Sequence, residues 1–229
     1  QWGNLRAPIS KDSAETRGAT WKKKYTGSFG TGCFSFFPTK NITTCEGGML
    51  TTNNKKKYQE IKKIIAHGIN KNKKKNFWNR VADLPGHNYR LPNHLASLGV
   101  SQLSKLNEFN NKRLLIAKKY DVFFRKFQDI FTIQKINPNL THSYQMYSIL
   151  VKQKYRNKLL HCLKKNGIEA SVHFDPPLHM QKYLKKFTKK LINTEILAKQ
   201  IVTLPIYPLL KTTEQNKIFK VIRNWYKKK

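Results

Sequence analysis

The sequence predicts an α/β or α+β protein, because segments typical of strands alternate with segments typical of helices along its 229 residues. Apolar residues make up 39% of the chain and aromatic residues 12%, a composition that indicates a folded protein rather than a disordered one. A chain of this length buries roughly 70–75% of its unfolded surface and needs neither disulfides nor metals to hold a core. At about 150 residues per domain it corresponds to one large domain or two small ones, and we expect a division near residue 110.

Short strands are expected to dominate the beginning of the chain. Residues 9–52 are rich in Gly, Ser, Thr and aromatic side chains, and segments 34–37 and 48–52 have the strongest strand character. A helix is predicted over 55–66, where apolar residues recur at helical spacing and a glycine follows the end. Residues 70–80 contain a run of lysines and several Asn, which indicates an exposed loop.

Two helices, or one bent helix, are expected in the middle of the chain. The first contains a stripe of apolar side chains that we expect to be buried, namely Leu95, Leu98, Leu103, Leu106 and Phe109. The second is predicted over 112–127.

The last third of the chain alternates again between strands and helices. Residues 143–151 have strand character, those between 155 and 163 have helical spacing, and 168–174 form a predicted short strand. A final helix follows a predicted capping box of Thr212 and Gln215, with apolar residues at i, i+3, i+4 and i+7.

Charge is the most unusual feature of the composition, because the formal net charge is +33. Such an excess invites a nucleic-acid function, since Lys and Arg neutralise phosphates. However, only eight of the 45 basic residues are Arg, the residue that base recognition and bidentate phosphate contacts prefer. The lysine runs are spread over the whole chain, and no zinc finger or ribonucleoprotein motif occurs. Polyanion binding is therefore the less favoured alternative, and we expect no specific nucleic-acid partner.

The cysteines and the hydropathy indicate a soluble, cytoplasmic protein. Cys33, Cys45 and Cys162 form no C-x-x-C pair, and their odd number argues against a disulfide framework or a cysteine-rich zinc site. No segment approaches the roughly 20 apolar residues that a membrane span requires. The chain begins with Gln1 rather than Met, so we expect it to be a piece of a longer protein.

Lys40 has an unusual setting for a lysine of this chain. It lies in a segment, residues 27–48, that holds five glycines and two apolar clusters. Between Tyr25 and Glu46, the only other ionisable side chains are two thiols. Desolvation in such a setting favours the neutral amine, which acts as a nucleophile or base. Residue spacing alone leaves an ordinary surface lysine in a loop as an equal alternative.

The string around Lys40, SFFPTKNITTCEGGML, resembles the cofactor-lysine segment of the DegT/DnrJ/StrS family of sugar aminotransferases, which use pyridoxal phosphate (PLP). Three further sets of residues resemble family motifs in the same order: 12–15 with 18–19, 86–91 with 98–103, and 167–179 with 204–208. The resemblance implies the aspartate-aminotransferase-like fold, fold type I of PLP enzymes. It implies that residues 1–110 are the remainder of the PLP-binding large domain, without its N-terminal part, and that 111–229 are a C-terminal α+β small domain.

The resemblance also implies roles for individual residues around the cofactor. Lys40 would hold the PLP aldehyde and carry a proton, Asp12 would lie beside the pyridine nitrogen, and Ser35 would donate to the phosphate. Glu15 would lie close to the cofactor ring. Without the resemblance, Asp12 would be interpreted as capping a turn and Ser35 as packing within a strand.

Four more positions are implied to complete the site. Asn88 would bind the phosphate of the partner subunit's cofactor in a homodimer, and Arg90 would support the same loop in the substrate site. His173 and His179 would border the sugar-nucleotide site. Together with Asp175 these two histidines could instead be metal ligands, but the two prolines within the set favour a shaped loop, and we expect no metal site.

The implied reaction transfers an amino group from an amino acid, expected to be glutamate, to a nucleotide-linked keto-deoxy sugar for surface polysaccharide synthesis. The chain departs from the family pattern at Lys11, where an acidic residue is usual, and at Cys45, where glycine is usual. A residue with a side chain is acceptable at position 45 only if the backbone does not require a positive φ. These departures and the missing N-terminal part favour, as an alternative, a non-catalytic fragment of such an enzyme.

Overall fold

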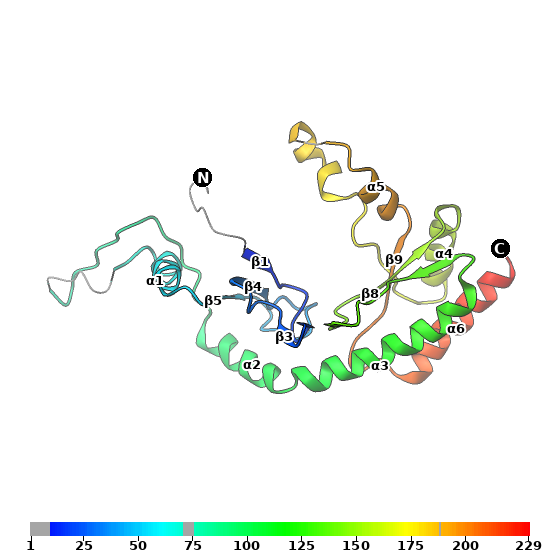
Figure 1. Cartoon of the computed structure of the whole chain (residues 1–229), viewed down its shortest axis with the longest axis horizontal. Coiled ribbons are helices and arrows are strands. Elements are labelled where there is room, and N and C mark those ends of the chain that lie inside the picture. Colours follow the sequence, from blue (N-terminus) through cyan, green and yellow to red (C-terminus); the bar gives the residue numbers. More distant parts are fainter. Residues whose placement is uncertain (1–9, 71–75, 188) are drawn as a thin grey trace. The chain divides into compact units, whose positions relative to one another are not determined.

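A computed structural model describes residues 10–70, 76–187 and 189–229 (Figure 1). The chain divides into two compact units, of which the first comprises residues 1–107 and 138–143 and the second comprises 108–137 and 144–229. Their assignment as a large-domain remainder and a small domain stays a prediction. Within the described residues, no helix has the length and apolar character that crossing a bilayer requires.

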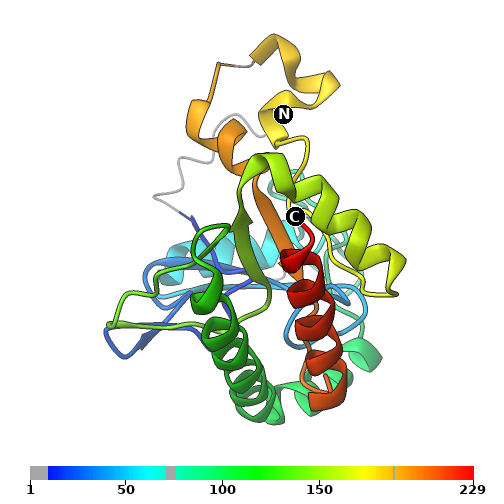
Figure 2. The ribbon, with the colours of Figure 1, turned by 90° about the vertical axis from the view of Figure 1, so that its right-hand side faces the viewer.

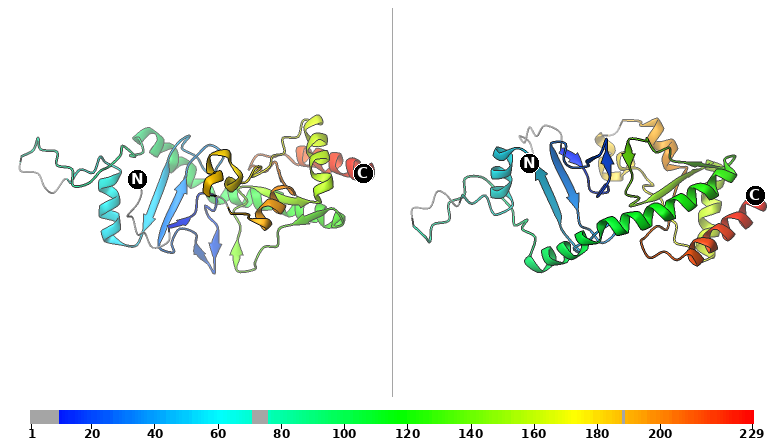
Figure 3. Two further views of the ribbon diagram at one scale, coloured as in Figure 1. Left: turned by 90° about the horizontal axis from the view of Figure 1, so that it is seen from above. Right: turned by 60° about the horizontal axis from the view of Figure 1, so that its bottom comes forward.

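The first unit is built on a three-stranded sheet with the order β1-β4-β5 (Figure 3). β1 (Ser10–Asp12) runs parallel to β4 (Thr31–Ser35), with Asp12 opposite Cys33. β5 (Gly48–Thr52) runs antiparallel to β4 and confirms the strand predicted over 48–52. The other predicted strand begins earlier than expected and ends at Ser35, because the chain then turns back toward β5.

A second small sheet and two helices complete the first unit. β2 (Thr20–Trp21) pairs antiparallel with β3 (Lys24–Tyr25) and with β7 (Leu140–Thr141). α1 (Lys55–Ile64) begins where the Asn54 side chain accepts the Lys57 N–H, as helix N-caps commonly do. α2 (Asn93–Ser104) lies later in the unit.

The second unit contains an antiparallel sheet with the order β6-β8-β9. These strands are β6 (Phe131–Ile133), β8 (Tyr147–Val151) and β9 (Ile201–Leu204). Its helices are α3 (Leu106–Phe124), which begins at the boundary of the units, α4 (Gln153–Lys165), α5 (Ile192–Ala198) and α6 (Thr212–Lys227). Three short 3₁₀ segments are η2 (Arg125–Phe127), η3 (Leu178–Met180) and η4 (Lys182–Phe187).

The main hydrophobic core lies in the second unit, where α3, α4 and α6 pack with the sheet. α3 and α6 lie alongside one another (Figure 2), and the ring of Phe219 contacts those of Tyr120 and Phe123. Each fully buried large apolar side chain contributes about 1.5–3 kcal/mol of transfer free energy. One buried cation also stabilises this unit: Arg113 donates through Nη1 to the carbonyls of Tyr144, Gln145 and Ile206.

Several sequence predictions about elements are wrong or only partly right. The apolar stripe between residues 95 and 109 is not buried, since no α2 side chain is buried and Leu103 is 59% exposed. The strand predicted over 168–174 reduces to a single bridge between Ser171 and Thr203. Of the predicted strand over 143–151, only Tyr147–Val151 forms β8. In the loop predicted over 70–80, residues 71–75 lie outside the described residues.

Candidate active site

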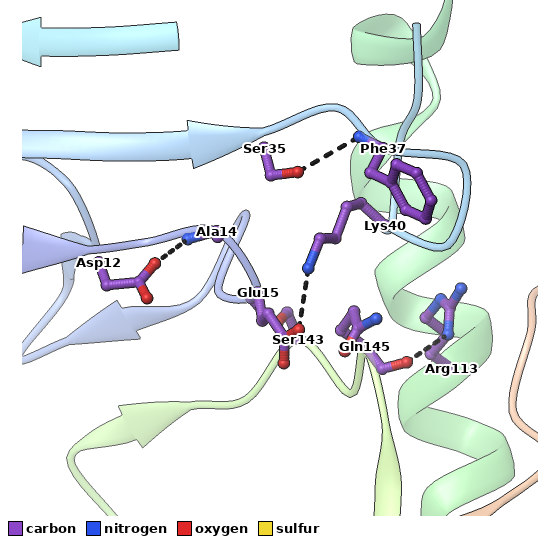
Figure 4. Close-up of polar contacts among 9 residues, drawn as sticks. All are labelled: Asp12, Ala14, Glu15, Ser35, Phe37, Lys40, Arg113, Ser143 and Gln145. Carbon is purple, nitrogen blue, oxygen red and sulfur yellow. Dashed lines mark hydrogen bonds and ion pairs between the residues drawn. The ribbon is translucent and has the colours of Figure 1, made fainter. Parts of the chain in front are cut away.

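Lys40 lies in the turn that follows β4, and its side chain is only 13% exposed. The Lys40 N–H donates to the Phe37 carbonyl at 3.0 Å, which closes the turn. The Nζ atom lies 2.8 Å from Glu15 Oε1 (Figure 4). Lys40 and Glu15 are both residues that the sequence nominated for the site. They are 25 positions apart in the chain, and the structure joins them in one ion pair.

Asp12 is the last residue of β1, and its carboxylate is held in place by the adjacent backbone. Its Oδ1 accepts the Ala14 N–H at 2.9 Å. The next residue, Ser13, donates its N–H to the Cys33 carbonyl of β4 at 2.8 Å. Since β1 and β4 are parallel, their carboxyl ends meet at one edge of the sheet, which is where Figure 4 shows Asp12, Glu15, Ser35 and Lys40.

Ser35 is the last residue of β4 and belongs to the same sheet edge. Its Oγ accepts the Phe37 N–H at 3.3 Å, which fixes the position of the hydroxyl oxygen. A serine hydroxyl that accepts one hydrogen bond can still donate its own proton. Ser35 can therefore donate to an anionic group bound at this edge.

Two residues that the sequence did not nominate hold the Glu15 and Lys40 segments together. Asn41 is buried and donates through Nδ2 to the Ser143 carbonyl at 2.9 Å. Ser143 in turn donates through Oγ to the Glu15 carbonyl at 3.2 Å. Asn41 lies within the motif around Lys40, but its partner is 102 positions away, so no local pattern could reveal the contact.

Arg17 is a third supporting residue that the sequence did not nominate. Its guanidinium lies 4.1 Å from the ring centroid of Phe36 and donates to the Ile42 carbonyl at 3.0 Å. Burial lowers the pKa of Arg17 to about 10, so it remains a cation at neutral pH. Arg17 thus holds the chain on both sides of Lys40.

Cys45 occupies a backbone conformation with φ of +65°. The condition set by the sequence, that the backbone should not need a positive φ at this position, is therefore not met. The Cys45 N–H donates to Thr43 Oγ1 at 2.8 Å, which holds the strained turn between Lys40 and β5.

Asn88 and Arg90 are exposed and lie on an irregular segment of the first unit. Asn88 forms an isolated bridge with Ala66, just beyond α1. The flanking residues His87 and Tyr89 donate their N–H groups to the carbonyls of Ile64, the last residue of α1, and of Ile65, its C-cap. Among the described residues, neither Asn88 nor Arg90 makes a hydrogen bond or ion pair with Lys40.

His173 and His179 lie in the second unit and have separate partners. His173 Nδ1 lies 3.1 Å from Thr203 Oγ1 on β9, and His179 Nε2 donates to Glu195 Oε1 at 3.4 Å. That hydrogen bond lowers the pKa of Glu195. Among the described residues, no group of three or more His, Cys, Asp or Glu could hold a metal ion.

The residues at the sheet edge fit the chemistry of PLP. A largely buried primary amine can hold an aldehyde, a fixed carboxylate can pair with a protonated pyridine nitrogen, and a hydroxyl can donate to a phosphate. These groups are Lys40, Asp12 and Ser35, and Glu15 pairs with the amine.

The model of the DegT/DnrJ/EryC1/StrS aminotransferase family matches residues 4–223. The chain belongs to this family. GDP-perosamine synthase of Escherichia coli O157:H7 is 32% identical over 223 residues, which are 96% of this chain and 59% of that protein. The chain therefore spans about three-fifths of this relative.

Solved structures agree with this assignment. Helicobacter pylori PseC, an aminotransferase of pseudoaminic acid biosynthesis, superposes with a TM-score of 0.86 and 29% identity, over 95% of this chain and 59% of that one. The sugar aminotransferase Spr1654 of Streptococcus pneumoniae, solved in PLP and PMP forms, has a TM-score of 0.85 and 26% identity, over 96% of this chain and 57–58% of that one. These matches confirm the predicted type I fold of PLP-dependent aminotransferases.

Proposed function

We propose that the chain forms the greater part of a PLP-dependent aminotransferase that acts on a nucleotide-linked keto sugar. The observation that carries this proposal is the ion pair of Lys40 with Glu15, at the sheet edge where β1 and β4 end. It places a shielded amine against the Glu15 carboxylate, at the sheet edge that also carries Asp12 and Ser35. Family membership and the relatives that make or modify sugars support the same activity.

Each residue at the sheet edge has a defined role in this proposal. When bound, PLP supplies an electron sink for cleavage of a C–H bond at the amino-bearing carbon. Lys40 would hold the PLP aldehyde, and its Nζ would take up and return the proton; Asp12 would keep the pyridine nitrogen protonated. Ser35 would donate a hydrogen bond from its hydroxyl to the phosphate, and Glu15 would orient the Lys40 amine.

The substrates in this proposal are a nucleotide-linked keto-deoxy sugar and an amino-acid donor, glutamate. The sugar nucleotide would contact His173 and His179, whose rings are held by Thr203 and Glu195. The product is an amino sugar for a surface polysaccharide. GDP-perosamine synthase and the pseudoaminic acid aminotransferase support an amino-sugar product.

A homodimer completes the proposed site. Asn88 would bind the phosphate of the partner subunit's cofactor, and Arg90 would support that loop in the substrate site. The exposure of both residues, and the anchoring of their segment to α1 through His87 and Tyr89, support a loop that extends to a second subunit.

Titration of the purified chain with PLP, followed by the absorbance of bound cofactor, tests the Asp12 role. Asp12→Asn keeps the hydrogen bond to Ala14 N–H within reach but removes the charge. We expect its dissociation constant for PLP to rise about tenfold, from loss of roughly 1.4 kcal/mol. Asp129→Asn, in the second unit, is the matched control and should leave PLP binding unchanged.

Equal PLP affinity of Asp12→Asn and the unaltered chain would contradict the cofactor assignment. Absence of saturable binding in the unaltered chain would favour a non-catalytic fragment. Amino transfer from glutamate to a nucleotide-linked keto sugar, measured as 2-oxoglutarate formed, then tests the reaction itself.

A further inference from the structure

Arg156 on α4 is buried, with 9% of its surface exposed, and its guanidinium bonds three acceptors from two other segments. Nη2 donates to Asp175 Oδ2 at 2.7 Å and to the Ala198 carbonyl at 3.4 Å. Nε donates to the Lys199 carbonyl at 3.2 Å. The two carbonyls belong to the C-terminal end of α5, where a cation is also favoured by the helix dipole.

The segments that Arg156 joins are those that hold the two histidines nominated for substrate binding. Asp175 lies two residues after His173 in the same loop. α5 carries Glu195, which accepts the hydrogen bond of His179 and also the Leu191 N–H at 3.1 Å. One guanidinium therefore connects the loop that begins at His173 with the helix that holds His179.

The geometry of this network suits an arginine better than a lysine. A planar guanidinium presents donors in fixed directions, so it can serve a carboxylate and two carbonyls at once, which a lysine ammonium on a flexible stem does less well. Asp175 is half-exposed, with 41% of its side chain accessible, whereas the Arg156 side chain is 11% exposed. The charge-assisted bond to Asp175 thus holds an exposed loop to a buried point of the unit.

We propose that Arg156 is a positioning residue that sets the placement of His173 and His179 for a nucleotide sugar. The inference rests on the proposed function, in which these histidines contact that substrate. Arg156 does not touch the substrate in this account: it acts through Asp175 on the loop and through the end of α5 on Glu195.

The first test is hydrogen exchange of the whole chain, read in peptides that cover 173–180 and 192–200. Arg156→Lys should raise exchange roughly tenfold in both segments, whereas Asp175→Asn should raise it only in 173–180. Lys112→Gln, which removes an exposed i,i+4 pair with Glu108, is the matched control. Unchanged exchange in both segments would overturn the network. If Arg156→Lys also raises exchange in β8, that variant is globally destabilised. The exchange of segment 173–180 in Asp175→Asn then tests the network instead.

The second test separates positioning from general stability by calorimetric titration with UDP-N-acetylglucosamine and GDP-mannose. Asp175→Asn should weaken binding of the nucleotide sugar roughly tenfold and leave PLP affinity unchanged. His173→Ala and His179→Ala are measured alongside. If the histidine variants weaken binding and Asp175→Asn does not, the Arg156 inference alone is overturned. If neither histidine variant has an effect, or the unaltered chain binds neither probe, the proposed substrate site fails and the inference with it.

Discussion

Cys45 shows how a single residue can conflict with the backbone it occupies. Its φ of +65° lies in the left-handed region, where a Cβ costs roughly 1–2 kcal/mol. The preceding turn carries Lys40, and the turn geometry is held by the hydrogen bond from Cys45 N–H to Thr43. From the sequence we could say only that a side chain at position 45 would be strained if the backbone had a positive φ. The motif gives residue types and not dihedral angles, so it could not show which conformation occurs.

Replacing Cys45 with glycine should therefore stabilise the chain. Part of the relief is offset by the greater entropy of glycine in the unfolded state, so we expect a gain of about 0.5–1 kcal/mol. Denaturant unfolding measures it as a higher midpoint. Cys45→Ala is the control, because it removes the thiol and keeps the Cβ; an equal gain from this variant would show that backbone conformation is not the cause.

The side chains around Lys40 divide into those that a motif can reveal and those that it cannot. Lys40, Ser35, Asp12 and Glu15 each lie at the end of a strand or in the turn after it, and short sequence patterns nominated all four. Arg17 and Ser143 act through contacts with segments distant in sequence, which only the folded chain brings together. Their roles could not be predicted from local spacing.

Among the elements, α6 was predicted correctly as a helix, but its N-terminal capping residues were predicted wrongly. Glu214, not Gln215, accepts the Lys211 N–H at 2.8 Å, and Thr212 is already inside the helix. Gln215 is instead 1% exposed and donates to the Ile116 carbonyl of α3 at 2.9 Å. Residue spacing cannot show whether a glutamine caps its own helix or bonds to a neighbouring one.

Gln215 is therefore expected to matter for docking of α6 on α3. Gln215→Ala leaves the Ile116 carbonyl without this donor and opens a small cavity, and we expect a loss of about 2–3 kcal/mol in unfolding free energy. Thermal or denaturant unfolding measures the loss. The exposed neighbour provides the control variant Asn216→Ala, and a similar small effect of both substitutions would argue against the interhelical role.

The strand predicted over 168–174 failed for a related reason. The apolar residues there resemble an edge strand, but the backbone of Ser171 pairs with Thr203 at one bridge only, and the following loop is held by side chains. Side-chain anchors such as Arg156–Asp175 replace the backbone ladder that the pattern predicted.

At the scale of the whole molecule, stability should depend on pH through His142. Burial lowers the pKa of His142 below its usual value near 6.5. As the pH falls, the His142 imidazole is therefore protonated more readily in the unfolded chain than in the folded chain. Stability is therefore fully present above about pH 6.5 and falls as the pH drops below it. The melting temperature of His142→Gln should fall less between pH 7 and 5.5 than that of the unaltered chain. His94→Gln, at an exposed position, is the control and should retain the full slope; an equal slope in His142→Gln would contradict the assignment.

The net charge of +33 is the most unusual property of the composition. The candidate site nevertheless depends on one lysine, which lies in a segment with few charged residues. The alternation of elements predicted the fold class, and the ordered motifs predicted the family that the comparisons confirm. The spread of lysines over exposed helix positions explains why charge itself did not locate the site.

We propose that Lys40, one of 37 lysines in the chain, is the residue that holds PLP. The most direct measurement is borohydride reduction of the chain with PLP, followed by peptide mass spectrometry to locate the pyridoxyl group. We predict that substoichiometric PLP labels the peptide containing Lys40 selectively, that Lys40→Ala abolishes this label, and that Lys62→Ala on α1 retains it. Labelling spread evenly over surface lysines, or unchanged in Lys40→Ala, would contradict the account.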